Sequence, residues 1–297
     1  MPASVVTSAP MLFGDHRNRL GECPTWDPGA GRLLWVDIPA GEILSSDPKG
    51  GDLKRWILPD RVASFGLATS GRWVVAFAHG VVMFDPKSNA IASLADPEPE
   101  PKTNRLNDGK VGPDGAFWVG SMDDRPDRQP VAALYRVTGE GKVEKKLTGL
   151  IVSNGLAWSP DGRTMFHSDS RGRWIEAHDF DPATGAMSRR RRIAELEDAQ
   201  GRPDGAACDA EGCYWSAGVS AQCINRFSPE GKLLESVAMP MPGCTMPCFG
   251  GDDLKTLYVT SLSDGLHPPY AGHPNAGRTA VLRVAVAGVP IGKFQDR

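Results

Sequence analysis

The sequence lacks any long run of apolar residues, so no segment is predicted to cross a membrane. Its first residues contain neither a basic region nor an apolar stretch typical of secretion signals, and a cytoplasmic location is expected. Net charge is also small, because 33 Lys and Arg face 36 Asp and Glu and the two signs are intermixed. Such a surface produces no strong field that would attract nucleic acid or anionic lipid. Neither nucleic acid nor a membrane is therefore an expected partner.

The common catalytic motifs of hydrolases are missing as well. There is no Gly-x-Ser-x-Gly nucleophile elbow and no His-Glu-x-x-His motif, and the six histidines show no ligand spacing. The six cysteines are too loosely spaced for a zinc site and are expected to be buried thiols. These absences exclude the most familiar serine hydrolases and zinc proteases.

What the sequence does contain is a repeated unit. Its 34 glycines and 25 prolines lie at turn-like positions, which favours many short strands over long helices. A turn rich in Gly or Pro, followed by a short apolar strand with an aromatic residue, recurs about every 40 to 50 residues. Six such copies occupy residues 31–37, 71–77, 115–120, 162–168, 212–217 and 254–260.

Additional strand and turn signals within each unit bring the total to about four strands per copy, as a propeller blade requires. A β-sandwich would instead show evenly spaced strands without a longer period. We therefore predict an all-β protein that forms one six-bladed β-propeller domain over residues 1–297.

Polar residues are expected to converge on the central axis of this propeller. The strand before each aromatic strand should be the innermost one, and four of these six strands hold a carboxylate or carboxamide. Glu22, Asn154 and Asp204 offer two negative charges and one neutral carbonyl, which suits a divalent cation. Taken alone, Asn154 or Asp204, each next to glycine, favours a turn, but both occupy the same phase of the repeat. We predict one axial divalent metal ion, with Ca²⁺, Mn²⁺, Mg²⁺, Fe²⁺ and Zn²⁺ all compatible.

Five motifs along the chain contain these polar residues or their counterparts in other copies: Gly21-Glu22-Cys-Pro-Thr-Trp26, Arg105-Leu-Asn107-Asp108-Gly109, Ser153-Asn154-Gly155-Leu-Ala-Trp158, Arg202-Pro203-Asp204-Gly205 and Pro247-Cys-Phe249-Gly250-Gly251. In this order they resemble the motifs of the gluconolactonase/SMP-30/regucalcin family over nearly the whole chain. The resemblance implies a six-bladed propeller whose metal is bound by Glu22, Asn154 and Asp204. It also implies that Arg105 and Asn107 contact a sugar lactone and that Asp204 acts as the catalytic base.

Two places depart from the family pattern. Cys23 stands where a glycine is common, and the loop 123–130 does not align. Because that loop could shape substrate choice, neutral and charged lactones are both compatible with the sequence.

The predicted activity is hydrolysis of an aldonolactone to its sugar acid, with a metal polarising the carbonyl and Asp204 accepting a proton from water. One alternative is a paraoxonase-like arylesterase or phosphotriesterase. Another is a non-catalytic propeller that binds metal or a protein partner, which the axial carboxylates disfavour. The small-molecule substrate is the expected partner of a monomer or homodimer.

Overall fold

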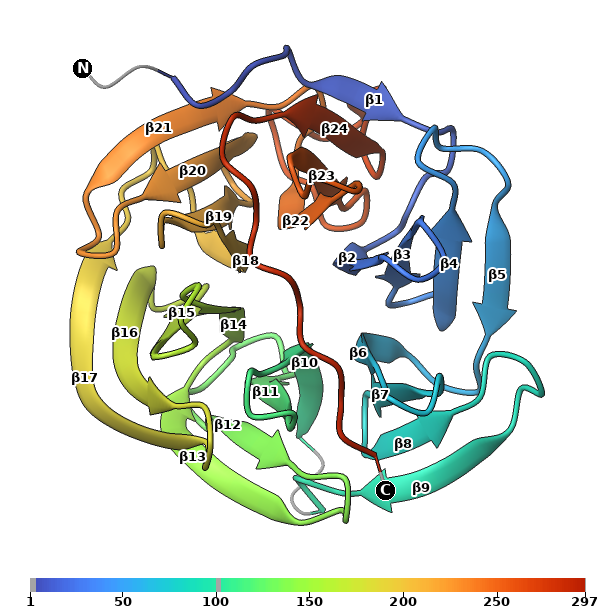
Figure 1. Cartoon of the computed structure of the whole chain (residues 1–297). Helices are drawn as coiled ribbons and strands as arrows, with labels where there is room; N and C mark the ends of the chain where they lie inside the picture. Colours follow the sequence, from blue (N-terminus) through green and yellow to red (C-terminus); the bar gives the residue numbers. More distant parts are fainter. Residues whose placement is uncertain (1–3, 100–102, 297) are drawn as a thin grey trace.

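The computed structural model describes residues 4–99 and 103–296, which form six four-stranded antiparallel sheets arranged around a central axis (Figure 1). The predicted all-β, six-bladed propeller is thus confirmed. Each of the six predicted aromatic strands is the second strand of its blade, and the strand before it is the innermost. Within the described ranges, no helix is long and apolar enough to cross a bilayer.

Five blades each consist of four consecutive strands that run from the axis outward (Figure 1). Blades 1 to 3 contain β2 (Gly21–Asp27), β3 (Arg32–Asp37), β4 (Glu42–Ser46) and β5 (Lys54–Ile57); β6 (Val62–Leu67), β7 (Trp73–Phe77), β8 (Val81–Phe84) and β9 (Ile91–Ala95); and β10 (Asn104–Val111), β11 (Phe117–Asp123), β12 (Ala132–Val137) and β13 (Val143–Leu150). Blades 4 and 5 contain β14 (Ser153–Trp158), β15 (Thr164–Asp169), β16 (Trp174–Asp181) and β17 (Ala186–Glu195); and β18 (Pro203–Cys208), β19 (Tyr214–Gly218), β20 (Cys223–Phe227) and β21 (Leu233–Ala238).

The sixth blade joins the two ends of the chain. It consists of β22 (Cys244–Gly250), β23 (Thr256–Ser261) and β24 (Thr279–Arg283), with β1 (Met11–Phe13) as its outermost strand. Met11 pairs with Val281 across this closure. Because β1 comes from the N-terminal end, it closes the ring and protects the edge of β24.

The hydrophobic core lies between neighbouring blades and not inside any one of them. Six clusters of buried apolar residues occupy the six interfaces of the ring. The two-residue period of a strand explains this arrangement, since successive side chains point to opposite faces. Val75 of β7 packs toward blade 1, for example, and its neighbour Val74 packs toward blade 3.

In blades 3 and 5, a carboxylate in the turn before the aromatic strand ties neighbouring strands of the blade together. Asp114 accepts a hydrogen bond from Trp118 Nε1 (3.0 Å) and pairs with Arg136 Nε (2.7 Å). Asp209 has equivalent Trp and Arg partners in blade 5. These turn carboxylates are fully engaged by the blade itself and so are structural.

Candidate metal and substrate site

All five residues predicted for the site line one cavity of ≈ 170 Å³ at one end of the central channel. Glu22 comes from β2, Arg105 and Asn107 from β10, Asn154 from β14 and Asp204 from β18. Each lies near the start of an innermost strand, which explains why residues about 180 positions apart reach a common space. Apolar side chains at or near the ends of strands also line it: Leu20, Ile38, Met122, Val152, Val219 and Leu262.

Irregular backbone accompanies each of these positions. The register of β2, β10, β14 and β18 shifts directly after the first few residues, as in a β-bulge. Bulges bend a strand and redirect its side chains, and they are common beside functional sites. Cys23 has a φ of 49°, in the left-handed region that favours glycine. This backbone requirement explains why a glycine is the expected residue there and shows that cysteine occupies the same conformation.

A continuous chain of hydrogen bonds connects four of the site residues. Arg105 Nη1 donates to Asn107 Oδ1 (2.9 Å), and Asn107 Nδ2 donates to Asn154 Oδ1 (3.2 Å). Asn154 Nδ2 then donates to Asp204 Oδ1 (2.6 Å) and to Ser170 Oγ (2.7 Å). Buried amides held on both sides have little freedom to rotate. The chain therefore fixes the orientation of these side chains before any ligand binds.

Three carboxylates lie close enough on the axis to disfavour one another's ionisation. Burial and the charges of Asp204 and Asp108 raise the pKa of Glu22 well above its ordinary value. Burial and the charge of Asp108 raise the pKa of Asp204 to about 8. Burial also raises the pKa of Asp108, although Lys110 opposes this effect. Burial and mutual repulsion thus oppose ionisation of these carboxyl groups, while Arg202, Arg105 and Arg128 favour the ionised form of Asp204.

These residues fit a divalent cation. Within the described part of the chain, neither Glu22 nor Asp204 forms an ion pair, and the buried Asp108 Oδ1 has no hydrogen-bond partner. No three Asp, Glu, His or Cys side chains among the described residues gather as a metal-binding group. A cation here would therefore need the carboxamide oxygen of Asn154 in addition to the two carboxylates, a set of hard oxygen ligands.

Arg105 is placed differently from the carboxylates. Its Nε lies 3.4 Å from Asp124 Oδ1, and burial lowers the pKa of its guanidinium to about 10, so it remains charged at neutral pH. Together with Asn107 it lies beside the carboxylates, where it can donate hydrogen bonds to an oxygen-rich ligand.

Sequence reasoning missed several residues of this cavity. Ser170 and three arginines, Arg128, Arg171 and Arg202, also line it. None belongs to an innermost strand, so the repeat gave no signal for Ser170, Arg128 or Arg171. Arg202 lies directly before β18, within one of the recognised motifs. The sequence indicated nothing about its role beyond its position next to Asp204.

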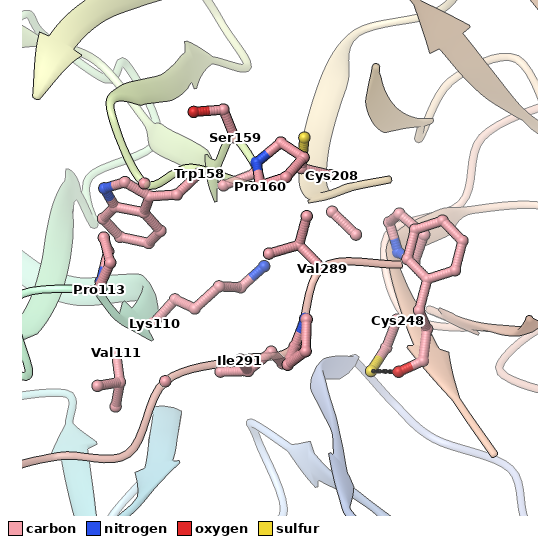
Figure 2. Close-up of a pocket in the computed structure, with 17 residues that line it drawn as sticks. Lys110, Val111, Pro113, Trp158, Ser159, Pro160, Cys208, Cys248, Val289 and Ile291 are labelled. Carbon is pink, nitrogen blue, oxygen red and sulfur yellow. Dashed lines mark hydrogen bonds between the residues drawn. The ribbon is translucent and has the colours of Figure 1, made fainter. Parts of the chain in front are cut away.

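A second and larger cavity, of ≈ 370 Å³, lies at the other end of the innermost strands (Figure 2). Lys110 Nζ projects into it and donates to the backbone oxygen of Ala206 (2.6 Å), while the C-terminal segment with Val289 and Ile291 crosses its mouth. Cys208 and Cys248 also line it, and all six cysteines of the chain are buried free thiols. Because no carboxylate lines this cavity in the described chain, it does not offer an oxygen-ligand site for a cation.

Comparison with known proteins identifies the family. A family model described as the SMP-30/gluconolactonase/LRE-like region matches residues 20–263. The chain is 36% identical over 271 residues to a 6-deoxy-6-sulfogluconolactonase of Pseudomonas putida, covering 91% of this chain and 92% of the relative. It is 34% identical over 284 residues to regucalcin of Gallus gallus, covering 93% and 95% of the two chains.

A solved structure supports the same assignment. The crystal structure of a calcium-binding protein, regucalcin, from Agrobacterium tumefaciens superposes with a TM-score of 0.91 at 27% identity. The match covers 99% of both chains. This chain therefore belongs to the SMP-30/gluconolactonase/LRE-like family.

Proposed function

We propose that this protein is a lactonase that hydrolyses a sugar lactone to the corresponding sugar acid and requires one divalent cation bound by Glu22, Asn154 and Asp204. The observation that carries the proposal is the group of axial carboxylates without ion pairs in the described chain, beside a prearranged line of hydrogen-bond donors. Family membership and the names of the gluconolactonase relatives support the reaction class.

When bound, the cation supplies a Lewis acid for the lactone carbonyl and lowers the pKa of a coordinated water. Asp204 accepts the proton from the attacking water. The hydrogen bond that its Oδ1 accepts from Asn154 Nδ2 fixes the orientation of this carboxylate.

Arg105 and Asn107 hold the substrate in place. Arg105 Nη2 can donate to a hydroxyl or carbonyl oxygen of the lactone, and Asn107 Oδ1 can accept from a hydroxyl, because both Nδ2 hydrogens of Asn107 are bonded to Ser153 O and Asn154 Oδ1. The apolar rim formed by residues such as Met122 and Leu262 limits the water around the reacting carbonyl. A cavity of ≈ 170 Å³ restricts the substrate to a small molecule.

The test is acid release from a panel of aldonolactones, followed with a pH indicator on protein stripped of metal and then supplied with each divalent ion. Phenyl acetate and a phosphotriester are included to detect the arylesterase alternatives. We expect cation-dependent hydrolysis of at least one lactone, and a loss of about 10³-fold or more in kcat for Asp204→Asn.

Asp161→Asn is the matched control, because Asp161 is an exposed turn carboxylate bound to Ser159 Oγ (2.6 Å) and lies outside the cavity. Folded protein that hydrolyses no lactone with any ion would overturn the proposal. Equal loss of activity in both Asp→Asn variants would remove Asp204 from the mechanism.

A further inference from the structure

The cavity that holds the axial carboxylates is also lined by four guanidinium groups. Arg105 belongs to the hydrogen-bond chain described above, while Arg128, Arg171 and Arg202 come from loops of blades 3, 4 and 5. Among the described residues, the carboxylates that line the same space are Glu22 and Asp204. Arginine is therefore in excess at this site, and a bound divalent cation would add further positive charge.

The three loop arginines lack carboxylate partners. In the described chain, no side-chain hydrogen bond or ion pair is formed by Arg128, Arg171 or Arg202. The Asp124 carboxylate, which attracts Arg128, is already bound by Arg61 Nη2 (3.0 Å) and lies 3.4 Å from Arg105 Nε. Like charges that share a cavity repel one another, so this arrangement costs free energy in the empty protein.

Elsewhere in the propeller, half-buried and buried arginines are paired. Arg136 contacts Asp114 at 2.7 Å, and Arg226 contacts Asp209 at 2.8 Å. Among the described residues, the half-buried Arg128 and Arg202 are thus an exception within this fold, while Arg171 beside them is exposed. A group of arginines without counter-charges is the arrangement that proteins use to bind sulfonate, phosphate or carboxylate groups.

The backbone of each loop arginine is fixed. Asp123, which is buried, accepts hydrogen bonds from Arg125 and from the backbone N of Gln129 (2.7 Å), and so holds the loop that carries Arg128. Asp169 Oδ1 accepts the backbone N of Arg171 (2.9 Å).

Arg202 is held in the same way, because its backbone N donates to Ser220 Oγ (2.9 Å). The guanidinium groups consequently project from anchored positions, which lowers the entropy lost when they bind a ligand.

We propose that Arg128, Arg171 and Arg202 form an anion-binding subsite and that the substrate is a sugar lactone with an anionic substituent remote from its carbonyl. This inference rests on the lactonase function proposed above. The three arginines lie in connections between strands, whereas Glu22, Asn154 and Asp204 lie on the innermost strands. The anionic end of the substrate would lie toward these connections, and the carbonyl would lie beside the axial carboxylates.

Steady-state kinetics on matched substrates test the proposal. Glucono-1,5-lactone serves as the neutral reference, and its analogues with a 6-sulfonate, a 6-phosphate or a 6-carboxylate identify the anion. We expect kcat/KM for at least one anionic lactone to exceed that for the neutral one by about tenfold or more. The preference should shrink as ionic strength rises, since salt screens the attraction.

Single substitutions then assign the effect to residues. Arg128→Gln and Arg171→Gln should each lower kcat/KM for the anionic lactone about tenfold or more, mainly through KM, while changing that for the neutral lactone little. Arg171→Lys should retain part of the preference. Arg189→Gln is the matched control, because it removes the same positive charge from a residue that is 80% exposed on the outer strand β17.

Binding without turnover separates this inference from the proposed function. Calorimetry compares 6-phosphogluconate with gluconate on the metal-free parent and on Arg171→Gln. Tighter binding of the phosphorylated acid that depends on Arg171 supports the subsite even if no lactone is hydrolysed. Hydrolysis of neutral and anionic lactones with equal kcat/KM, unchanged in both Gln variants, would overturn the subsite and leave the lactonase function intact.

Discussion

Replacing Asp204 by asparagine should make the metal-free protein more stable than the parent at pH 8, although the same change abolishes the proposed chemistry. The carboxyl is buried, and its pKa is raised from an ordinary 3.8 to about 8 by burial and by the charge of Asp108. A carboxyl whose pKa is higher in the folded state favours folding while it is protonated. That stabilisation is complete below pH 3.8 and is lost as the pH rises toward about 8.

The size of the effect follows from the two pKa values. Each tenfold change in a proton-binding constant corresponds to about 1.4 kcal/mol. Between pH 5 and pH 8, ionisation of Asp204 should therefore lower the free energy of unfolding of the metal-free parent by about 3–4 kcal/mol. Asparagine cannot ionise and keeps an oxygen acceptor for Asn154 Nδ2, so Asp204→Asn should escape this loss.

Urea unfolding at pH 5, 6.5 and 8, with chelator and at constant ionic strength, measures the difference. Asp161→Asn should follow the parent, because the pKa of this exposed carboxyl is lowered by Ser159 and it is already ionised throughout the range. Adding a divalent cation at pH 8 should restabilise the parent and leave Asp204→Asn almost unchanged. Identical pH dependence in the parent and Asp204→Asn would refute the electrostatic reasoning about the axis.

Four further outcomes are expected. Asn107→Ala should lower kcat/KM for the lactone about 10- to 100-fold, because it breaks the hydrogen-bond chain that orients Arg105 and Asn154; steady-state kinetics measure this. Asp114→Ala should lower the free energy of unfolding by about 3 kcal/mol in urea titrations, because it removes the buried acceptor of Trp118 Nε1 and Arg136 Nε and leaves Arg136 only its 3.4 Å contact with Glu144. A thiol reagent should label no cysteine in the native protein and all six after denaturation, since every thiol is buried. A chain that begins at residue 14 lacks β1, and its melting temperature should fall by several degrees with increased aggregation, because the edge of β24 is exposed.

Contrary results have distinct meanings. Full activity of Asn107→Ala would show that this carboxamide neither orients Asn154 nor binds substrate. A stable Asp114→Ala variant would show that the turn carboxylates are dispensable. Rapid labelling of native thiols would indicate local opening of a blade, and an unaffected truncated chain would show that β1 adds little to ring closure.

Local pattern was enough to predict the architecture. The alternation of apolar residues, the turns before aromatic strands and their longer period depend only on residues near one another in sequence, so six blades could be counted without tertiary information. The same period distinguished Asp204 from the turn carboxylate Asp114. Asp204 lies on the strand that precedes its aromatic strand, whereas Asp114 lies in the turn directly before its aromatic strand. The position of a residue within the repeat therefore predicts how far that residue lies from the propeller axis.

The position of a residue within the repeat does not predict which side chains contact one another around the axis once the ring is closed. The repeat predicted that Glu22, Asn154 and Asp204 would approach one another, but not that Asn107 and Asn154 would be joined by a hydrogen bond, nor that Asp108 would raise the pKa of Asp204. Those effects depend on burial and on distances of a few ångströms, which arise only when separate blades meet.

The sequence by itself thus determined the number of blades and the candidate ligands, since both follow from periodic local signals. Only the tertiary structure decided that β1 completes the last blade, that loop 123–130 carries Arg128 into the cavity, and that Arg171 and Arg202 join it there. Loops between strands carry no period, and their positions are set by long-range packing and by single anchors such as Asp123. The charge of the site, and with it the proposed choice of substrate, is therefore a property of the folded ring.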